Sequence, residues 1–190
     1  MTICNMSIEG GARCGYINPD EKTFSYIKNK LYAPKNEHWD RALRWWESLK
    51  SDENSIYDDV TKLDASKVEP TVTWGITPGQ SISINQQIPL LDDLSPNDKL
   101  VAEEAYEYMS FKPGQLIKDT PVDVCFIGSC TNGRISDLRV AAKVLKGKKV
   151  SKNVKAFAVP GSEKVATEAK QEGLDQIFKD SGFQWREPGC

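Results

Sequence analysis

The sequence predicts an α/β fold, with a parallel sheet and helices on both of its faces in the C-terminal part and an α+β segment before it. Short apolar runs alternate with helical stripes over residues 122–185, which is typical of parallel strands joined by helical crossovers. Residues 21–50 show helical periodicity instead. The 190 residues, 39% of them hydrophobic, are enough for one ordinary domain or parts of two.

The first half of the chain predicts a loop, two helices and several short strands. Glycines and an Asn-Pro-Asp turn signal favour loop or tightly packed backbone over residues 1–20. Apolar spacing predicts helices over residues 21–32 and 36–50, and Trp39, Trp45 and Trp46 are interpreted as packing residues. Residues rich in β-branched and aromatic side chains predict strands over 55–63, 68–74 and 81–84.

A second set of elements follows. Ser95 and Pro96 predict the start of a helix that runs to about Met109. A connector rich in proline and glycine over residues 112–120 predicts a boundary between two partial domains, 1–118 and 119–190. Beyond it, we expect a strand buried on both faces over 122–127, a strand over 154–159 and a third over 183–185. Helices are expected over 135–145, 162–172 and 174–182.

Composition excludes several classes of function. The net charge is −2 and lysines and arginines form no long block, so nucleic acid is not an expected partner. No apolar run approaches the roughly 18 residues of a membrane span, and no export signal opens the chain, so we expect no membrane and a cytoplasmic location. Five widely spaced cysteines in such a chain argue against a disulfide framework. His38 is the only histidine and is expected on the surface, so metal chemistry must depend on cysteine.

Two cysteines follow strands of the predicted sheet. Cys130 follows the first strand and Cys190 follows the third, and the carboxyl ends of parallel strands meet at one edge, where ligands gather in such folds. Cys130 also precedes a helix, whose dipole favours a thiolate. The alternative is that both are small buried residues. Cys4, Cys14 and Cys125 are expected to be of that structural kind, without a chemical role.

Four long motifs carry a resemblance to a known family. They are MTICNMSIEGGARCGYINPDE over residues 1–21, VTWGITPGQ over 72–80, DVCFIGSCTNGRISDLR over 123–139 and GFQWREPGC over 182–190. Together they resemble the aconitase family, and within it the isopropylmalate isomerases, in one register along the whole chain. The resemblance implies an aconitase-like fold and an iron-sulfur hydro-lyase, in which three cysteines hold a 4Fe-4S cluster.

The resemblance assigns roles to four residues. Cys130 matches the first cluster cysteine, in its Gly-Ser-Cys-Thr-Asn motif, and Cys190 matches the first cysteine of a Cys-x-x-Cys pair. Both are therefore expected as metal and cofactor ligands, and the third ligand lies beyond the chain end. Asn5 and Glu9 match catalytic residues near cluster and substrate. Without the resemblance, they would read as a polar loop that satisfies its own backbone.

The implied reaction isomerises 2-isopropylmalate and 3-isopropylmalate through 2-isopropylmaleate, in leucine biosynthesis. Its catalytic base lies on a swivelling domain, expected here on a separate small subunit that would be the protein partner, and the substrate is a 2-hydroxy dicarboxylate. A sister hydro-lyase, such as a homoaconitase or a citramalate-type enzyme, is the first alternative. A non-catalytic α/β binding module is the second.

The chain also departs from the family pattern. It stops at Cys190 and lacks the active-site histidines that the family carries earlier, since His38 lies in no matching motif. We therefore expect an internal fragment of a longer subunit, inactive by itself, and an organelle stroma becomes the expected location if a transit peptide precedes it.

Overall fold

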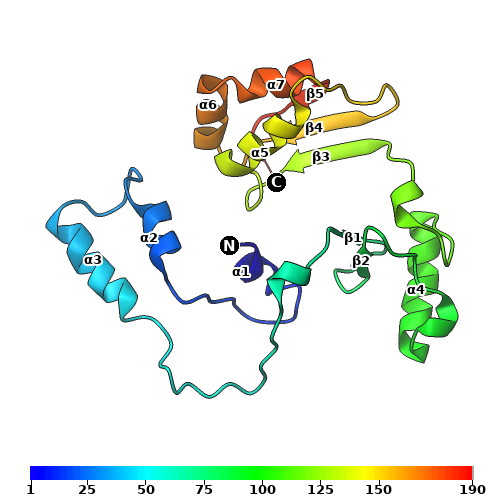
Figure 1. The fold of residues 1–190 in the computed structure, drawn as a ribbon, viewed down its shortest axis with the longest axis horizontal. Helices are drawn as coiled ribbons and strands as arrows, with labels where there is room; N and C mark the ends of the chain where they lie inside the picture. The colour runs from blue at the N-terminus through cyan, green and yellow to red at the C-terminus, as the bar shows by residue number, and fades with distance from the viewer. Residues whose placement is uncertain (190) are drawn as a thin grey trace. The chain divides into compact units, whose positions relative to one another are not determined.

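The computed structural model describes residues 1–189, except for the side chain of Asp119. Contacts group the chain into two compact units (Figure 1). One comprises Ile3–Ala65, and the other comprises Met1–Thr2 together with the chain from Ser66 onward. Every helix in the described part of the chain is too short or too polar to cross a lipid bilayer.

The helices of the first unit pack through aromatic rings. Its elements are α1 (Thr2–Met6, which begins in the other unit), α2 (Glu21–Ile27) and α3 (Glu37–Glu47). The Asp20 carboxylate caps α2 by accepting from the Thr23 backbone N–H at 2.9 Å, and this bond lowers the pKa of Asp20. Phe24 is buried and stacks on Trp46, with 6.3 Å between ring centroids, and Trp39 meets Trp46 edge-on at 5.6 Å. The two predicted helices and the packing role of Trp39 and Trp46 are confirmed. The packing role expected of Trp45 was wrong, because its side chain points to solvent and is 62% exposed.

Two expectations about which of the first 32 residues are helical were wrong. Residues 2–6 form a short helix where a loop was expected, because the glycines that break helices come later, with Gly11 at φ 85°. The helix predicted to reach residue 32 ends at Ile27. Asn29 adopts φ 66°, a left-handed conformation that terminates helices.

The strand predicted over residues 55–63 was also wrong. The structure has no strand in this segment, and Ile56 and Val60 are 97% and 64% exposed. A strand needs a neighbouring strand for its backbone N–H and C=O groups, and none pairs with this segment within the described residues. Residues 55–63 have high β-propensity but no strand to pair with, so they form an irregular connection. The short helix η1 (Ala65–Lys67) follows it.

The second unit contains two hydrophobic cores. The first is built from β1 (Thr71–Thr73), β2 (Ser81–Ser83), η2 (Leu91–Asp93), α4 (Pro96–Met109) and η3 (Ile117–Asp119). The two strands pair antiparallel, and the Ser95 hydroxyl caps α4 as predicted. Trp74 packs against Tyr106 with ring centroids 5.2 Å apart, and the buried Ile88 belongs to the same core.

The second core belongs to a three-stranded parallel sheet. In chain order its elements are β3 (Val124–Gly128), α5 (Ile135–Leu145), β4 (Lys155–Val159), α6 (Glu163–Gln171), α7 (Leu174–Asp180) and β5 (Phe183–Trp185). The strand order is β3-β4-β5, and both pairs are parallel. Leu138 of α5, Ala169 of α6 and Phe178 of α7 all join Ala156 and Ala158 of β4 in this core. The predicted α/β fold with a parallel sheet flanked by helices is confirmed.

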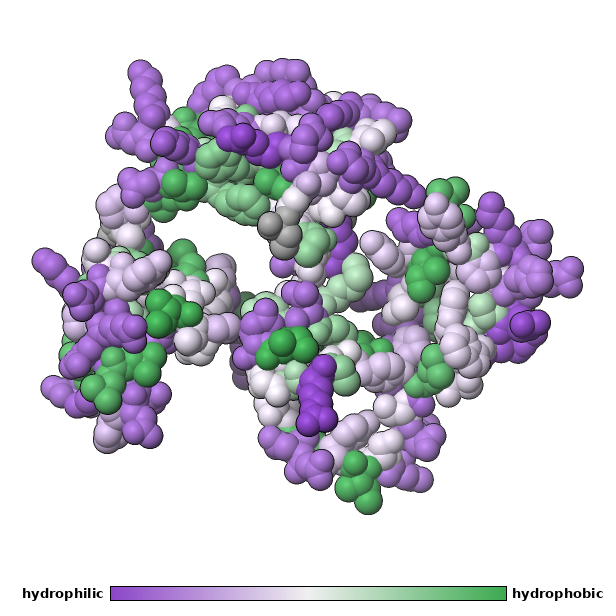
Figure 2. All heavy atoms as spheres, turned by 180° about the vertical axis from the view of Figure 1, so that it is seen from behind, coloured by the Kyte–Doolittle hydropathy of each residue, from purple (hydrophilic) through white to green (hydrophobic). Residues whose placement is uncertain are grey.

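The helices cover one face of this sheet rather than two. The strand order advances in one direction, so right-handed crossovers place both connections on the same side. On the opposite face, Val124 and Phe126 are 55% and 56% exposed, which corrects the expectation that β3 is buried on both faces. Figure 2 shows that hydrophobic side chains, in green, also reach the surface elsewhere on the chain. The domain boundary near residue 118 stays a prediction.

Candidate functional site

The candidate site begins at the carboxyl end of β3, where the chain turns sharply. Gly128 has φ 146° and Ser129 has φ 79°, conformations that L side chains rarely adopt. The turn leaves Cys130 exposed at the edge of the sheet. The alternative interpretation of Cys130 as a small buried residue is therefore wrong.

Glycines let this turn pack directly on the end of the neighbouring strand β4. A side chain on Gly128 would overlap the carbonyl group of Val159. Gly133 and Gly161 face each other, and the Gly161 N–H donates to the Gly133 carbonyl at 2.8 Å. These contacts pack the loop over residues 128–133 against the carboxyl end of β4.

The immediate surroundings of the Cys130 thiol are polar. Its Sγ lies 3.8 Å from Oγ1 of Thr131 and 4.0 Å from Oγ of Ser129. Helix α5 starts a few residues later, with the Asp137 carboxylate accepting from the Arg134 N–H at 3.1 Å. Hydroxyl groups beside the sulfur and a helix N-terminus nearby both favour the thiolate form of a cysteine. An exposed cysteine sulfur at this edge is a suitable soft ligand for iron.

The other cysteines separate into different environments. Cys190 lies outside the described residues, so its predicted role as a second ligand stays a prediction. Cys125 is half-buried and packs against the core beneath the sheet, as expected for a structural residue. Cys4 is half-buried, but Cys14 is exposed, contrary to the expectation that it is buried. Among the residues that the structure describes, no group of three metal-ligating side chains comes together.

Asn5 and Glu9 belong to the other unit. Asn5 lies on α1 and Glu9 in the turn after it, and both side chains are exposed. They are therefore not committed to packing, but their catalytic roles stay predictions.

A further contact of this site was not predicted from the sequence. The Thr2 hydroxyl donates to Oδ1 of Asn132 at 2.8 Å, across a separation of 130 residues. Thr2 and Asn132 lie in two of the motifs quoted above, and only the folded chain shows that they touch.

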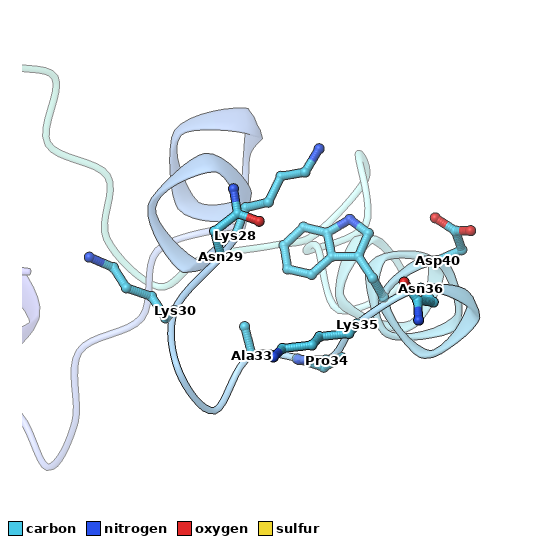
Figure 3. Close-up of a pocket in the computed structure, with 9 residues that line it drawn as sticks. Lys28, Asn29, Lys30, Ala33, Pro34, Lys35, Asn36 and Asp40 are labelled. Atoms are coloured by element: carbon cyan, nitrogen blue, oxygen red, sulfur yellow. The ribbon is translucent and has the colours of Figure 1, made fainter.

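A hollow of about 550 Å³ lies in the first unit, away from these motifs (Figure 3). It is lined by Lys28, Lys30, Lys35, Trp39 and neighbouring residues of the segment that joins α2 to α3. No predicted site residue lines it, and His38 is exposed on α3 as expected.

Comparisons with known proteins agree on one family. The model of the aconitase family (aconitate hydratase) matches residues 1–190. The chain is 94% identical to the 3-isopropylmalate dehydratase large subunit of Prochlorococcus marinus strain MIT 9215, and 93% identical to that of strain AS9601. It is 62% identical to the protein of the same name from Synechocystis sp. strain PCC 6803. Each match covers the whole of this chain and 41% of the relative, so the chain spans about two fifths of their length.

Proposed function

Because the chain belongs to the aconitase family, we propose that it is part of the large subunit of a 3-isopropylmalate dehydratase. The proposed reaction removes water from 2-isopropylmalate to give 2-isopropylmaleate, and adds it back with the hydroxyl moved. The observation that carries the proposal is the exposed thiol of Cys130, in the Gly-Ser-Cys-Thr-Asn motif, at the carboxyl edge of a parallel sheet. The identities to relatives of that name support it.

Among the described residues, Cys130 has the chemistry expected of one ligand of a 4Fe-4S cluster. Cys130 offers an exposed sulfur next to hydroxyl groups, and Cys190 is proposed as a second ligand. The third ligand would come from outside this chain. When bound, the cluster would supply a Lewis acid for the hydroxyl and carboxylate groups of a 2-hydroxy dicarboxylate.

The chain's own residues would then handle protons and orientation. The Glu9 carboxylate would move the proton of the departing hydroxyl or of the returning water. The Asn5 side chain would hydrogen-bond an atom of the cluster or of the substrate. The base that removes the neighbouring C–H proton is proposed to lie on a small partner subunit, in keeping with the words "large subunit" in the names of the relatives.

Serine substitutions in the complete large subunit, purified with its small subunit, test the ligand assignment. We expect Cys130→Ser to abolish cluster assembly, because a serine hydroxyl replaces a thiolate ligand. Cys125→Ser is the matched control and should retain the cluster, since that side chain packs against the core. Iron and sulfide per chain are the measurement. Full cluster content in both variants would show that the assignment is wrong.

Substrate competition separates the proposed function from a sister hydro-lyase. The complete enzyme should turn over 3-isopropylmalate in preference to homocitrate and citramalate. Preference for either of these would keep the cluster assignment and reject the substrate. The exposed thiol of Cys130 already counts against a binding module in which the cysteines are buried.

A further inference from the structure

Gly15 packs directly against the backbone of helix α1. A Cβ added at Gly15 would lie 2.6 Å from Cα of Cys4 and 2.9 Å from the Cys4 carbonyl oxygen, closer than real Cβ atoms come to other groups. It would also overlap the Ser7 hydroxyl. All three residues belong to the first unit. Only glycine therefore lets the segment after the turn lie this close to α1.

A capped turn joins α1 to that segment. The Ala12 N–H donates to the Ser7 carbonyl at 2.9 Å. The Gly11 N–H donates to the Ile8 carbonyl, also at 2.9 Å, and Gly11 adopts φ 85°. These two bonds around a left-handed residue form a Schellman motif, which fixes how the chain leaves a helical segment. Glu9 lies inside this turn, so the motif fixes its backbone.

The two residues proposed as catalytic share this supported backbone. Cys4 directly precedes Asn5 on α1, and Ser7 lies between Asn5 and Glu9. The side chains of Asn5 and Glu9 are both exposed, so their own packing does not determine where they lie. Their positions depend instead on the backbone that Gly15 contacts at Cys4 and Ser7.

We propose that Gly15 is a positioning residue for Asn5 and Glu9, because its lack of a side chain lets the segment after the turn support α1. The proposal deepens the proposed function and rests on it, since that function takes Asn5 and Glu9 as catalytic. Gly15 would act through α1 and touch neither substrate nor cluster. A misplacement of about 1 Å in a catalytic group can cost about 100-fold in rate.

The first test is kinetic and uses the complete large subunit with its small subunit. For Gly15→Ala, we expect kcat with 3-isopropylmalate to fall about 100-fold per assembled cluster, and KM to change much less. Iron and sulfide per chain should stay unchanged, because Cys130 belongs to the other unit. A variant that merely unfolds would instead lose iron and kcat together.

Gly10→Ala is the matched control, because it adds the same methyl group to the same turn. Its Cβ would lie 3.4 Å from the Ser7 carbonyl oxygen, which is an ordinary contact, and φ at Gly10 is not positive. We expect its kcat and KM to equal those of the unmodified enzyme. Equal kcat per cluster in Gly15→Ala and in the unmodified enzyme would overturn the proposal.

The second test measures α1 without reference to activity. In the complete subunit, Gly15→Ala should speed amide hydrogen exchange over residues 3–12 about tenfold and leave β4 unchanged. If Gly15→Ala does not fold, Gly11→Val tests the same support, since valine rarely adopts a positive φ, while Gly11→Asn tolerates it. Gly11→Val should lose kcat and exchange protection, and Gly11→Asn should keep both.

Unchanged exchange over residues 3–12 in Gly15→Ala would also overturn the proposal. An unmodified complete enzyme without dehydratase activity would instead reject the proposed function. In that case the exchange data would still decide whether Gly15 supports α1, because they depend on the fold of the first unit alone.

Discussion

At the scale of single residues, the site depends on positions where a side chain cannot fit. Gly128 combines φ 146° with a position where an added Cβ would overlap the carbonyl of Val159, so only a glycine lets β3 lie this close to the end of β4. The adjacent Ser129 accepts a positive φ of 79° to turn the chain outward. The exposure of Cys130 is therefore a consequence of its two predecessors, in a loop stiffened by backbone contacts.

Gly128→Ala tests this dependence. We expect the variant of the complete subunit to lose most of its cluster, because the added Cβ pushes the loop away from Val159 and displaces Cys130. Gly147→Ala is a matched control, with φ 76° but nothing within 4 Å of an added Cβ. It should cost only the backbone strain of about 1 kcal/mol and keep the cluster. Equal iron content in the two variants would show that the close contact is unimportant.

At the scale of elements, one buried ring joins α7 to the sheet. Phe178 is fully buried and meets Phe183 edge-on at 5.5 Å and Trp185 at 5.7 Å. Phe178→Ala should lower the local opening free energy of the β4 amides by about 3–5 kcal/mol, measured by hydrogen exchange in the complete subunit. Val140→Ala, at a position 62% exposed, should change it by less than about 0.5 kcal/mol. A similar effect of both substitutions would argue against this core.

Helices α5 and α6 are also joined by charge. The Arg139 guanidinium donates to Glu168 at 3.2 Å and to Glu172 at 2.5 Å, and this hydrogen bond lowers the pKa of Glu172 from its ordinary 4.5. A lowered carboxyl pKa stabilises the fold above the ordinary value, and this contribution is lost as the pH falls through the lowered value.

Glu172→Gln should therefore lower the urea midpoint of the complete subunit at neutral pH. The difference from the unmodified protein should disappear well below pH 4.5, where Glu172 is protonated in both states. It should also shrink in about 1 M salt, because both side chains are partly exposed. Glu107→Gln on the exposed side of α4 is the control. A difference that persists in acid would mean that the pair does not act through charge.

The sequence predicted elements where local signals and long-range packing agree. Ser95 and Pro96 marked the start of α4, and the alternation after residue 122 gave the parallel sheet. The strand prediction over residues 55–63 failed because a strand needs a neighbouring strand to pair with, and residue propensities do not show whether one is present. At the site, the topology predicted that Cys130 lies at the sheet edge, but its role as a ligand stays a prediction, and the contact of Asn132 with Thr2 depends on the fold. The roles of Asn5, Glu9 and Cys190 stay predictions.

At the scale of the whole molecule, the proposed chemistry requires more ligands than the described residues bring together. The family resemblance implies three thiolates, and Cys130 is the one that the described residues place at the sheet edge. The face of the sheet that carries Val124 and Phe126 is open as well. Exposed apolar surface of this kind favours association of an isolated chain. The incomplete ligand set and the exposed sheet face both lead us to expect that these 190 residues function as part of a longer polypeptide, like that of the relatives.

We therefore expect the 190-residue chain, expressed alone, to bind no stable 4Fe-4S cluster and to show no dehydratase activity. Two cysteines cannot replace three, because an iron atom that lacks its thiolate ligand is readily lost from the cluster. Anaerobic reconstitution, with iron and sulfide counted per chain and the visible charge-transfer absorbance recorded, is the measurement. The complete large subunit with its small subunit, treated in parallel, should gain both cluster and activity. A stoichiometric, stable cluster in the short chain would mean that ligands other than the three family cysteines complete the site.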